Sequence, residues 1–132
     1  MALRRAALFG IVAVVALVAA ACGRSASSLN QEANGLYQQG DYAAALELYQ
    51  RAQAERPELL ELRYNAGNAF HRLGRYDRAA QEARRALFAD DPQLLAKGYY
   101  SLGNHLFRQG EMDGALDAYK NALIHDPTDA DA

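Results

Sequence analysis

From residue 30 onward, apolar side chains recur at spacings of three and four, in segments separated by short polar breaks. This spacing places them on one stripe of an α-helix. The pattern predicts helices over residues 30–39, 42–55, 60–73, 76–89, 95–109 and 112–125. No segment alternates apolar and polar residues as a strand does, so the sequence predicts an all-α fold.

The breaks between these segments follow one scheme, repeated three times. A glycine ends the first helix of each pair, where a left-handed residue is favoured. An aspartate lies at or near the start of the second helix, where a carboxylate meets free backbone N–H groups. A proline then stops that helix, because it cannot continue the hydrogen-bond ladder. These residues are Gly40, Gly74 and Gly110; Asp41, Asp77 and Asp113; Pro57, Pro92 and Pro127.

The chain also repeats itself in sequence. Residues 67–79 and 103–115 are identical at six of thirteen positions, with an offset of 36 residues. A weaker copy lies 34 residues before the first, around Asn34 and Gly40. Self-similarity at this period indicates a helical solenoid, in which each helix pair buries its apolar face against its neighbours. Gly67 and Gly103 mark places where the helices approach closely.

The third copy resembles the tetratricopeptide repeat (TPR) family at nine positions between Tyr99 and Pro127. The resemblance implies a right-handed α-solenoid of three TPR helix pairs behind an N-terminal segment, with units at about 26–59, 60–95 and 96–129. The second unit departs from the family at Arg63 and Ala66, where large apolar residues are usual, and its connection at Asp90-Asp91-Pro92 is two residues longer. The first unit has Ala33 instead of the early glycine. The matching residues are Tyr99, Leu102, Gly103, Leu106, Gly110, Ala115, Tyr119, Ala122 and Pro127.

The N-terminus reads as a secretory leader. Two arginines precede an uninterrupted apolar run over residues 6–21, and Cys22 stands at its junction with polar sequence. Val18-Ala19-Ala20-Ala21-Cys22 resembles a bacterial lipobox, although Ala19 stands where leucine is usual. That resemblance implies lipidation of Cys22. An uncleaved helical anchor and simple cleavage after an Ala-x-Ala site are the alternatives.

These readings divide the chain into residues 1–22 (signal peptide with lipobox, or anchor), a polar linker at 23–29, the TPR array at 30–129 and a tail at 130–132. They predict a protein of the bacterial cell envelope, anchored to the membrane through a lipid or an N-terminal helix, with its body outside the cytoplasm. An uncleaved anchor would reverse that orientation, because Arg4 and Arg5 favour a cytoplasmic N-terminus.

Composition and motif content exclude several classes of function. The net charge is −2, which gives no general attraction for nucleic acid. Cys22 is the only cysteine, so we expect neither a disulfide framework nor a cysteine-based zinc site. His71 and His105 have no acidic or cysteine partner at metal-ligand spacing, so no metal site is predicted. The sequence shows no catalytic constellation and no cofactor motif, and we expect a protein that is not an enzyme.

The predicted binding surface is the inner face of the first helices. Asn34, Asn68 and Asn104 recur there at equivalent positions, and a carboxamide can donate to and accept from a peptide backbone. Asn65 and Lys97 belong to the same face. The alternative is that the asparagines only fix the geometry between helices and that the tyrosines belong to the core. Further candidate contacts are Tyr37, Tyr64, Tyr100, His71, Arg72, Phe107 and Arg108.

TPR proteins that grip a C-terminal carboxylate use five groove positions. The resemblance matches Asn34, Asn65 and Lys97, but Asn30 and Ser101 stand where the family has Lys and Arg. Much of the charge pairing is therefore lost, and a full carboxylate clamp is not expected.

The sequence also predicts the character of two further surfaces, on the second helix of unit two and on the last helix. Arg75, Arg78, Arg84 and Arg85 make the second helix of unit two basic, with Glu82 able to pair with some of them on a solvated face. The last helix carries Leu116, Tyr119, Leu123 and Ile124, and we expect a partner, a second copy of the chain or the membrane surface to cover it.

The leading hypothesis is a non-catalytic scaffold or adaptor that binds a protein or peptide partner. Residues 64–68, 89–92 and 96–104 also resemble the TPR component of the Bat (aerotolerance) group, whose members accompany von Willebrand A-type membrane proteins. A TPR lipoprotein that assists assembly of a pilus or secretion complex is the alternative. An enzyme, or an enzyme's regulatory subunit, is the third reading.

Overall fold

The computed structural model describes residues 23–128. The leader, Cys22 and the tail at 130–132 lie outside this range, so the predictions made for them stay predictions. Within the range, no helix is long and apolar enough to cross a membrane.

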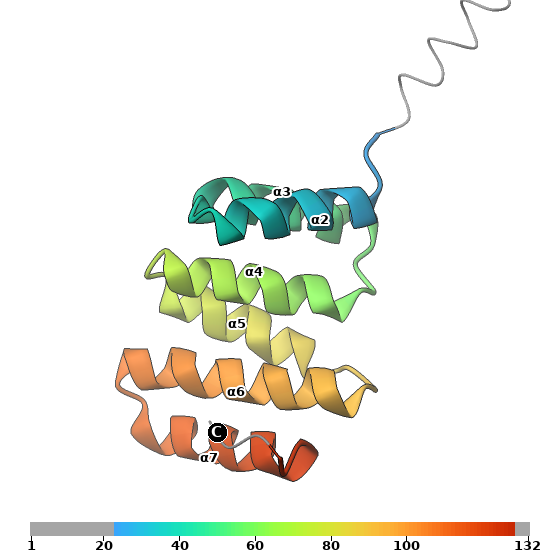
Figure 1. Ribbon diagram of the computed structural model, residues 1–132. Coiled ribbons are helices and arrows are strands. Elements are labelled where there is room, and N and C mark those ends of the chain that lie inside the picture. The colour runs from blue at the N-terminus through green and yellow to red at the C-terminus, as the bar shows by residue number, and fades with distance from the viewer. Residues whose placement is uncertain (1–22, 129–132) are drawn as a thin grey trace, which may run out of the picture.

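The described chain consists of helices joined by short connections, with no strand between residues 23 and 128. Consecutive helices form antiparallel pairs, and the pairs stack in layers from one end of the molecule to the other (Figure 1). The prediction of an all-helical TPR-like solenoid is confirmed. The helices are α2 (Ala26–Gln38), α3 (Tyr42–Glu55), α4 (Leu60–Arg72), α5 (Tyr76–Ala86), α6 (Pro92–Gln109) and α7 (Met112–His125).

Two helices begin earlier than predicted because polar side chains cap them. Helix α2 begins at Ala26 instead of residue 30, since Ser25 accepts a hydrogen bond from the Ser28 amide at 3.2 Å. Helix α6 begins at Pro92, with the Asp91 carboxylate accepting from the Gln93 amide at 3.0 Å. The prediction that Pro92 stops the preceding helix was wrong. That helix ends at Ala86, and proline suits the first turn of α6, where its missing N–H needs no partner.

The predicted glycine breaks are confirmed. Gly40, Gly74 and Gly110 have φ of +87°, +74° and +82°, a left-handed conformation that suits glycine because it has no Cβ. Asp41 caps α3 by accepting from the Ala44 amide at 3.2 Å. Asp77 and Asp113 lie instead in the first turns of α5 and α7, where they favourably face the positive helix end.

Close helix contacts explain the repeated glycine of the first helices. A Cβ on Gly103 would lie 2.5 Å from the Tyr119 ring, and one on Gly67 would lie 3.3 Å from the Ala79 carbonyl oxygen. Around these contacts, one apolar core spans α2 to α4 and reaches α5 at Ala79. A second core joins α5, α6 and α7. Each unit is therefore held by its neighbours as well as by its own helix pair.

Candidate functional site

Two of the three recurring asparagines are tied to tyrosines of their own repeat. The Tyr49 hydroxyl donates to Asn34 Oδ1 at 2.7 Å, and the Tyr119 hydroxyl donates to Asn104 Oδ1 at 2.8 Å. Burial raises the pKa of Tyr49 to about 12 and also raises that of Tyr119. Both hydroxyls therefore stay protonated, and each bond holds the first helix of its unit against the second.

The third asparagine makes a different contact, because unit two has Ala83 where its neighbours have these tyrosines. Asn68 Oδ1 accepts from Ser101 Oγ of α6 at 3.3 Å. Asn65 Nδ2, one turn earlier, donates to Asn30 Oδ1 of α2 at 3.0 Å. Carboxamides thus connect the first helices of successive units. The asparagines fix helix geometry, yet the bonds of Asn34, Asn68 and Asn104 use Oδ1 and leave each Nδ2 group to donate to a ligand.

Several predicted binding residues line hollows between α2, α4 and α6. A hollow of about 170 Å³ is lined by three of the predicted carboxamides together with aromatic and amide neighbours. A second hollow of about 210 Å³ includes Tyr64 and Lys97. We call the two together the asparagine groove. Its residues are Asn34, Tyr37, Gln38, Tyr49, Asn65 and Asn68 in the first hollow, and Glu61, Tyr64, Asp91, Gln93, Leu94 and Lys97 in the second.

Apart from Lys97, the predicted residues of unit three lie outside these hollows. Asn104 is held by Tyr119, and the Tyr100 ring lies 5.9 Å from the Tyr119 ring between centroids. Phe107 is 52% exposed near the end of α6. The structure therefore leaves most predicted residues of unit three, together with His71 and Arg72 of unit two, outside the hollows. The predicted residues that it brings together are Asn34, Tyr37, Tyr64, Asn65, Asn68 and Lys97.

Arg72 and Arg108 brace neighbouring repeats at the ends of their helices. Arg72 donates to the Tyr42 hydroxyl, and its guanidinium lies 4.7 Å from the centre of the Tyr42 ring. Arg108 repeats the arrangement on Tyr76, with a hydrogen bond of 3.0 Å and a ring distance of 5.3 Å. Each arginine joins the end of a first helix to the start of the preceding unit's second helix, and cation–π attraction adds to the hydrogen bond.

His71 and His105 form a pair. Their Nδ1 atoms are 2.8 Å apart, so one nitrogen donates and the other accepts. His105 is 2% exposed, and burial lowers its pKa to about 3. Burial also lowers the pKa of His71, with a further contribution from Arg108. His105 Nε2 has no partner within residues 23–128, which favours the tautomer in which His105 Nδ1–H donates to His71. No cluster of three metal-ligating side chains occurs in the same residues.

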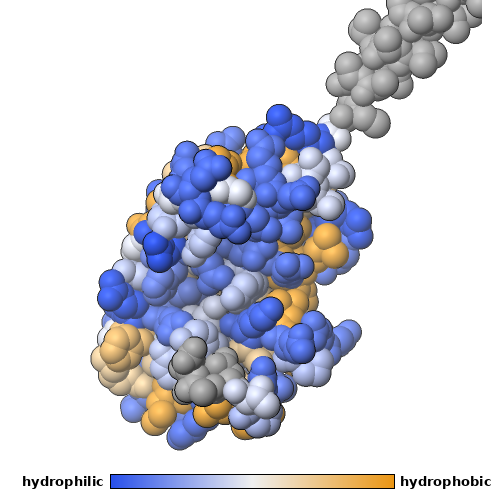
Figure 2. Space-filling view, in the orientation of Figure 1, coloured by the Kyte–Doolittle hydropathy of each residue, from blue (hydrophilic) through white to orange (hydrophobic). Residues whose placement is uncertain are grey.

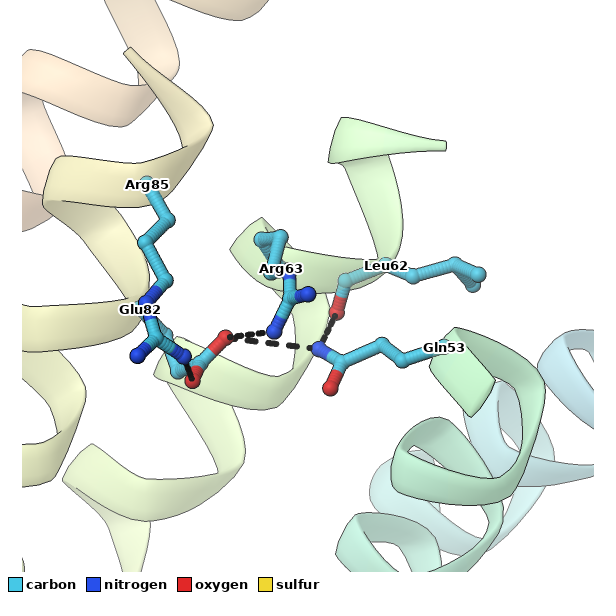
Figure 3. Close-up of polar contacts among 5 residues, drawn as sticks. All are labelled: Gln53, Leu62, Arg63, Glu82 and Arg85. Atoms are coloured by element: carbon cyan, nitrogen blue, oxygen red, sulfur yellow. Dashed lines mark hydrogen bonds and ion pairs between the residues drawn. The ribbon is translucent and has the colours of Figure 1, made fainter. Parts of the chain in front are cut away.

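The predicted pairing of Glu82 with an arginine of its own helix is confirmed at Arg85, but the expectation that this pairing lies on a solvated face was wrong. Glu82 is only 5% exposed and connects three helices, instead of pairing on a solvated face (Figure 3). It accepts from Arg63 of α4 at 3.3 Å and from Arg85 at 3.1 Å. Gln53 of α3 donates to Glu82 at 3.4 Å and to the Leu62 carbonyl at 3.0 Å. Glu82 therefore belongs to the buried side of α5. Its carboxylate can be buried because Arg63, Arg85 and Gln53 donate hydrogen bonds to it.

Sequence reasoning started from the recurring asparagines and missed five polar residues that line the groove. A signal for Tyr49 was present, since Tyr49 and Tyr119 each follow a recurring asparagine by 15 residues. Asn30 and Ser101 were considered only as clamp positions, and their hydrogen bonds were not predicted. The missed lining residues are Gln38, Tyr49, Glu61, Asp91 and Gln93.

Family models described as tetratricopeptide repeat match residues 30–94 and 96–129, which cover the helix pairs except for the first turn of α2 and Leu95. The chain belongs to the tetratricopeptide repeat (TPR) family. Among curated proteins, this TPR chain is 32% identical over 103 residues to the small glutamine-rich tetratricopeptide repeat-containing protein 2 of Mycosarcoma maydis, covering 78% of the chain and 29% of that protein. It is 29% identical over 102 residues to the BBSome complex member BBS4 of Bos taurus, covering 77% and 19%. The chain therefore spans less than a third of these relatives.

Solved structures share the fold at lower identity. The first TPR domain of Spaghetti (RPAP3), bound to the HSP90 peptide SRMEEVD, superposes with a TM-score of 0.76 at 23% identity, covering 80% of this chain and 82% of that one. The Sgt2 TPR domain from Aspergillus fumigatus gives 0.73 at 24% identity, covering 78% and 67%. MamA gives 0.72 at 21% identity, covering 82% and 62%. At these identities the likeness shows the fold alone.

Proposed function

We propose that this TPR chain is a non-catalytic adaptor that holds an extended segment of a protein partner in the asparagine groove. The observation that carries the proposal is the row of carboxamides across α2 and α4, bonded through Oδ1 at Asn34 and Asn68. An extended peptide presents N–H and C=O groups in turn, and carboxamides can satisfy both. TPR structures with this fold hold peptides, as the SRMEEVD complex illustrates.

The charge of the groove favours a neutral, polar stretch of the partner. Lys97 is the one cation among its lining residues, and Glu61 and Asp91 lie beside it. Asn30 and Ser101 are engaged with Asn65 and Asn68, so neither position offers a positive charge to a terminal carboxylate. Recognition therefore rests on hydrogen bonds and on the tyrosine surfaces, and it favours an internal segment over an acidic C-terminus.

Site-specific photo-crosslinking in cells tests this placement. A benzophenone amino acid would replace Tyr37 or Tyr64 in the groove, or the exposed Gln50 and Arg51 of α3 as matched controls. The groove positions are expected to yield a common crosslinked partner, and the α3 positions none. Crosslinks of the same partner from α3 alone would place the binding surface elsewhere and contradict the proposal.

The setting proposed for this adaptor is the bacterial cell envelope, with anchoring through Cys22 or an uncleaved helix. Support comes from the apolar run over residues 6–21 and the cysteine at its end. The intact mass of membrane-extracted protein tests it. A mature chain that begins at a lipidated Cys22, and is lost in Cys22→Ala, is the expected result. An intact chain starting at Met1 would indicate a helical anchor, and a chain recovered only from the cytosol would contradict envelope anchoring.

Self-association through α7 also stays a proposal. Leu116 and Ile124 are 53% and 70% exposed on this helix, and Leu123 is 38% exposed. Sedimentation of the purified protein across a range of concentrations tests it. We expect a dimer that dissociates in the variant Leu116→Gln/Ile124→Gln. A wild-type chain that stays monomeric at every concentration would rule it out.

A further inference from the structure

A larger hollow adjoins the second hollow of the asparagine groove, with which it shares Glu61, Asp91 and Leu94, and lies where the connections between repeats gather. Its volume is about 590 Å³, within the range of ligand-binding pockets. It is bounded by the start of α2, the α3–α4 connection and the α5–α6 connection. In Figure 2, apolar surface is visible among hydrophilic residues on the side that carries these connections. We call it the connection hollow.

The wall of the connection hollow is apolar, and part of it is unusually exposed. Leu59 and Phe88 are 40% and 83% exposed, and Leu60 and Leu94 are half-buried beside them. Phe88 lies in the connection from α5 to α6, after the helix ends at Ala86. An aromatic ring left this open beside a hollow presents a large area that a partner can bury.

The rim of the hollow is acidic. Its lining residues include four carboxylates and no lysine or arginine. Asp91 is engaged in capping α6, and Glu58 accepts from Arg56. Glu61 and Asp90 are exposed at the same rim. Negative potential above an apolar floor attracts cationic groups attached to an apolar anchor.

We propose that the connection hollow is a second docking site, adjoining the asparagine groove, for a partner segment with a bulky apolar side chain flanked by lysine or arginine. The apolar side chain packs against Phe88 and Leu59, and the basic groups face Glu61 and Asp90. A protein segment fits better than a membrane surface, because four carboxylates repel anionic lipid headgroups.

Selection from a random peptide library displayed on phage tests the chemistry. The bait is the full chain in mild detergent, with counter-selection against Phe88→Ser. The expected peptides combine a bulky apolar residue with Lys or Arg. Their affinity falls by about tenfold in Phe88→Ser and by several-fold in Asp90→Asn, and it weakens as salt is raised.

Matched substitutions separate this site from the rest of the molecule. Met112→Ser and Asp117→Asn, changes at exposed positions of α7, leave the affinity unchanged. Tyr64→Ala, in the asparagine groove, also leaves it unchanged, so the two sites can fail separately. A selection that yields no peptide distinguishing wild type from Phe88→Ser, or that yields acidic peptides, overturns the proposal.

A tryptophan reporter separates a protein segment from a lipid surface. The chain has no tryptophan, so Phe88→Trp supplies a single emitter at the hollow, with Met112→Trp as control. A selected peptide is expected to shift the emission of Phe88→Trp to shorter wavelength and not that of Met112→Trp. If Phe88→Trp in phosphatidylcholine–phosphatidylglycerol vesicles is instead quenched by brominated acyl chains without peptide, the hollow faces lipid and the proposal is wrong.

Discussion

Arg63 Nη1 lies 3.3 Å from Glu82 Oε2. In the first repeat the corresponding residues are Leu29 and Leu48, and both are buried. The arginine side chain is 23% exposed and the carboxylate side chain 7%. Two positions that belong to the apolar core in the first repeat thus hold an ion pair in the second. Gln53, which also contacts Glu82, corresponds to Leu87 and Leu123 of the later repeats. The three substitutions form one network, so their effects on stability are coupled.

Breaking this pair is expected to destabilise the fold more than replacing it. Glu82→Leu leaves Arg63 largely buried without its main partner, and we expect a loss of about 2–4 kcal/mol in the free energy of unfolding. The double variant Arg63→Leu/Glu82→Leu restores the apolar residues of the first repeat and should return to within about 1 kcal/mol of wild type. Urea unfolding followed by circular dichroism measures both, and additive losses would contradict the coupling.

Glycine at position 103 is expected to be essential for packing. A Cβ there would lie 2.5 Å from the Tyr119 ring, so Gly103→Ala must displace the ring and its bond to Asn104. We expect a loss of about 1–3 kcal/mol in thermal or urea unfolding.

The matched control is Gly35→Ala in the middle of α2. No atom lies within 4 Å of its added Cβ, and alanine favours the helix by about 0.5–1 kcal/mol over glycine. Gly35→Ala is therefore expected to stabilise the protein. A similar sign for both substitutions would show that helix propensity, and not the Tyr119 contact, decides the outcome.

The histidine pair predicts a loss of stability in mild acid. The pKa of His105 falls to about 3 in the folded chain, against about 6.5 in an unfolded one. The unfolded state therefore binds the proton first, and stability is complete above pH ~6.5 and declines as the pH falls toward 3. The slope approaches about 1.4 kcal/mol per pH unit for His105, and the lowered pKa of His71 adds to it.

Unfolding measured between pH ~7 and pH ~5, above the range in which ordinary carboxylates titrate, checks this prediction. His105→Leu should flatten the pH dependence over that window. An unchanged slope in His105→Leu would assign the acid sensitivity to other groups.

The absence of two clamp cations predicts weak discrimination of a C-terminal carboxylate. Asn30 and Ser101 occupy positions at which the family's clamp has Lys and Arg, and both are engaged in neutral hydrogen bonds. The peptide SRMEEVD and its C-terminally amidated form should therefore bind with affinities that differ by less than about twofold, since charge-assisted pairing is lost. Fluorescence anisotropy measures both. Strong preference for the free carboxylate would show that Lys97 and the asparagines suffice for a clamp.

Much of the fold followed from local signals. The boundaries of α3 and α7 agree with the prediction to the residue, because tyrosine or methionine follows a clear break and the apolar spacing is regular. The prediction for the α5–α6 connection was wrong, because a proline can end one helix or begin the next. The hydrogen bond from the Gln93 amide to Asp91 shows that Pro92 begins α6. Of the candidate site, the asparagine row was found from its period, while the partners that hold each asparagine were not.

Between residues 23 and 128, the sequence by itself determined six helices, their pairing into repeats and the positions of their left-handed glycines. Those features depend on residues that lie within one or two helical turns of each other in sequence. At that range, the spacing of apolar residues and the backbone preference of glycine decide the local structure. Only the tertiary structure decided that Glu82 is buried and that His71 meets His105. These contacts join residues 19 and 34 positions apart, and the side-chain pattern of a single helix does not reveal which partner satisfies a polar group across a helix interface.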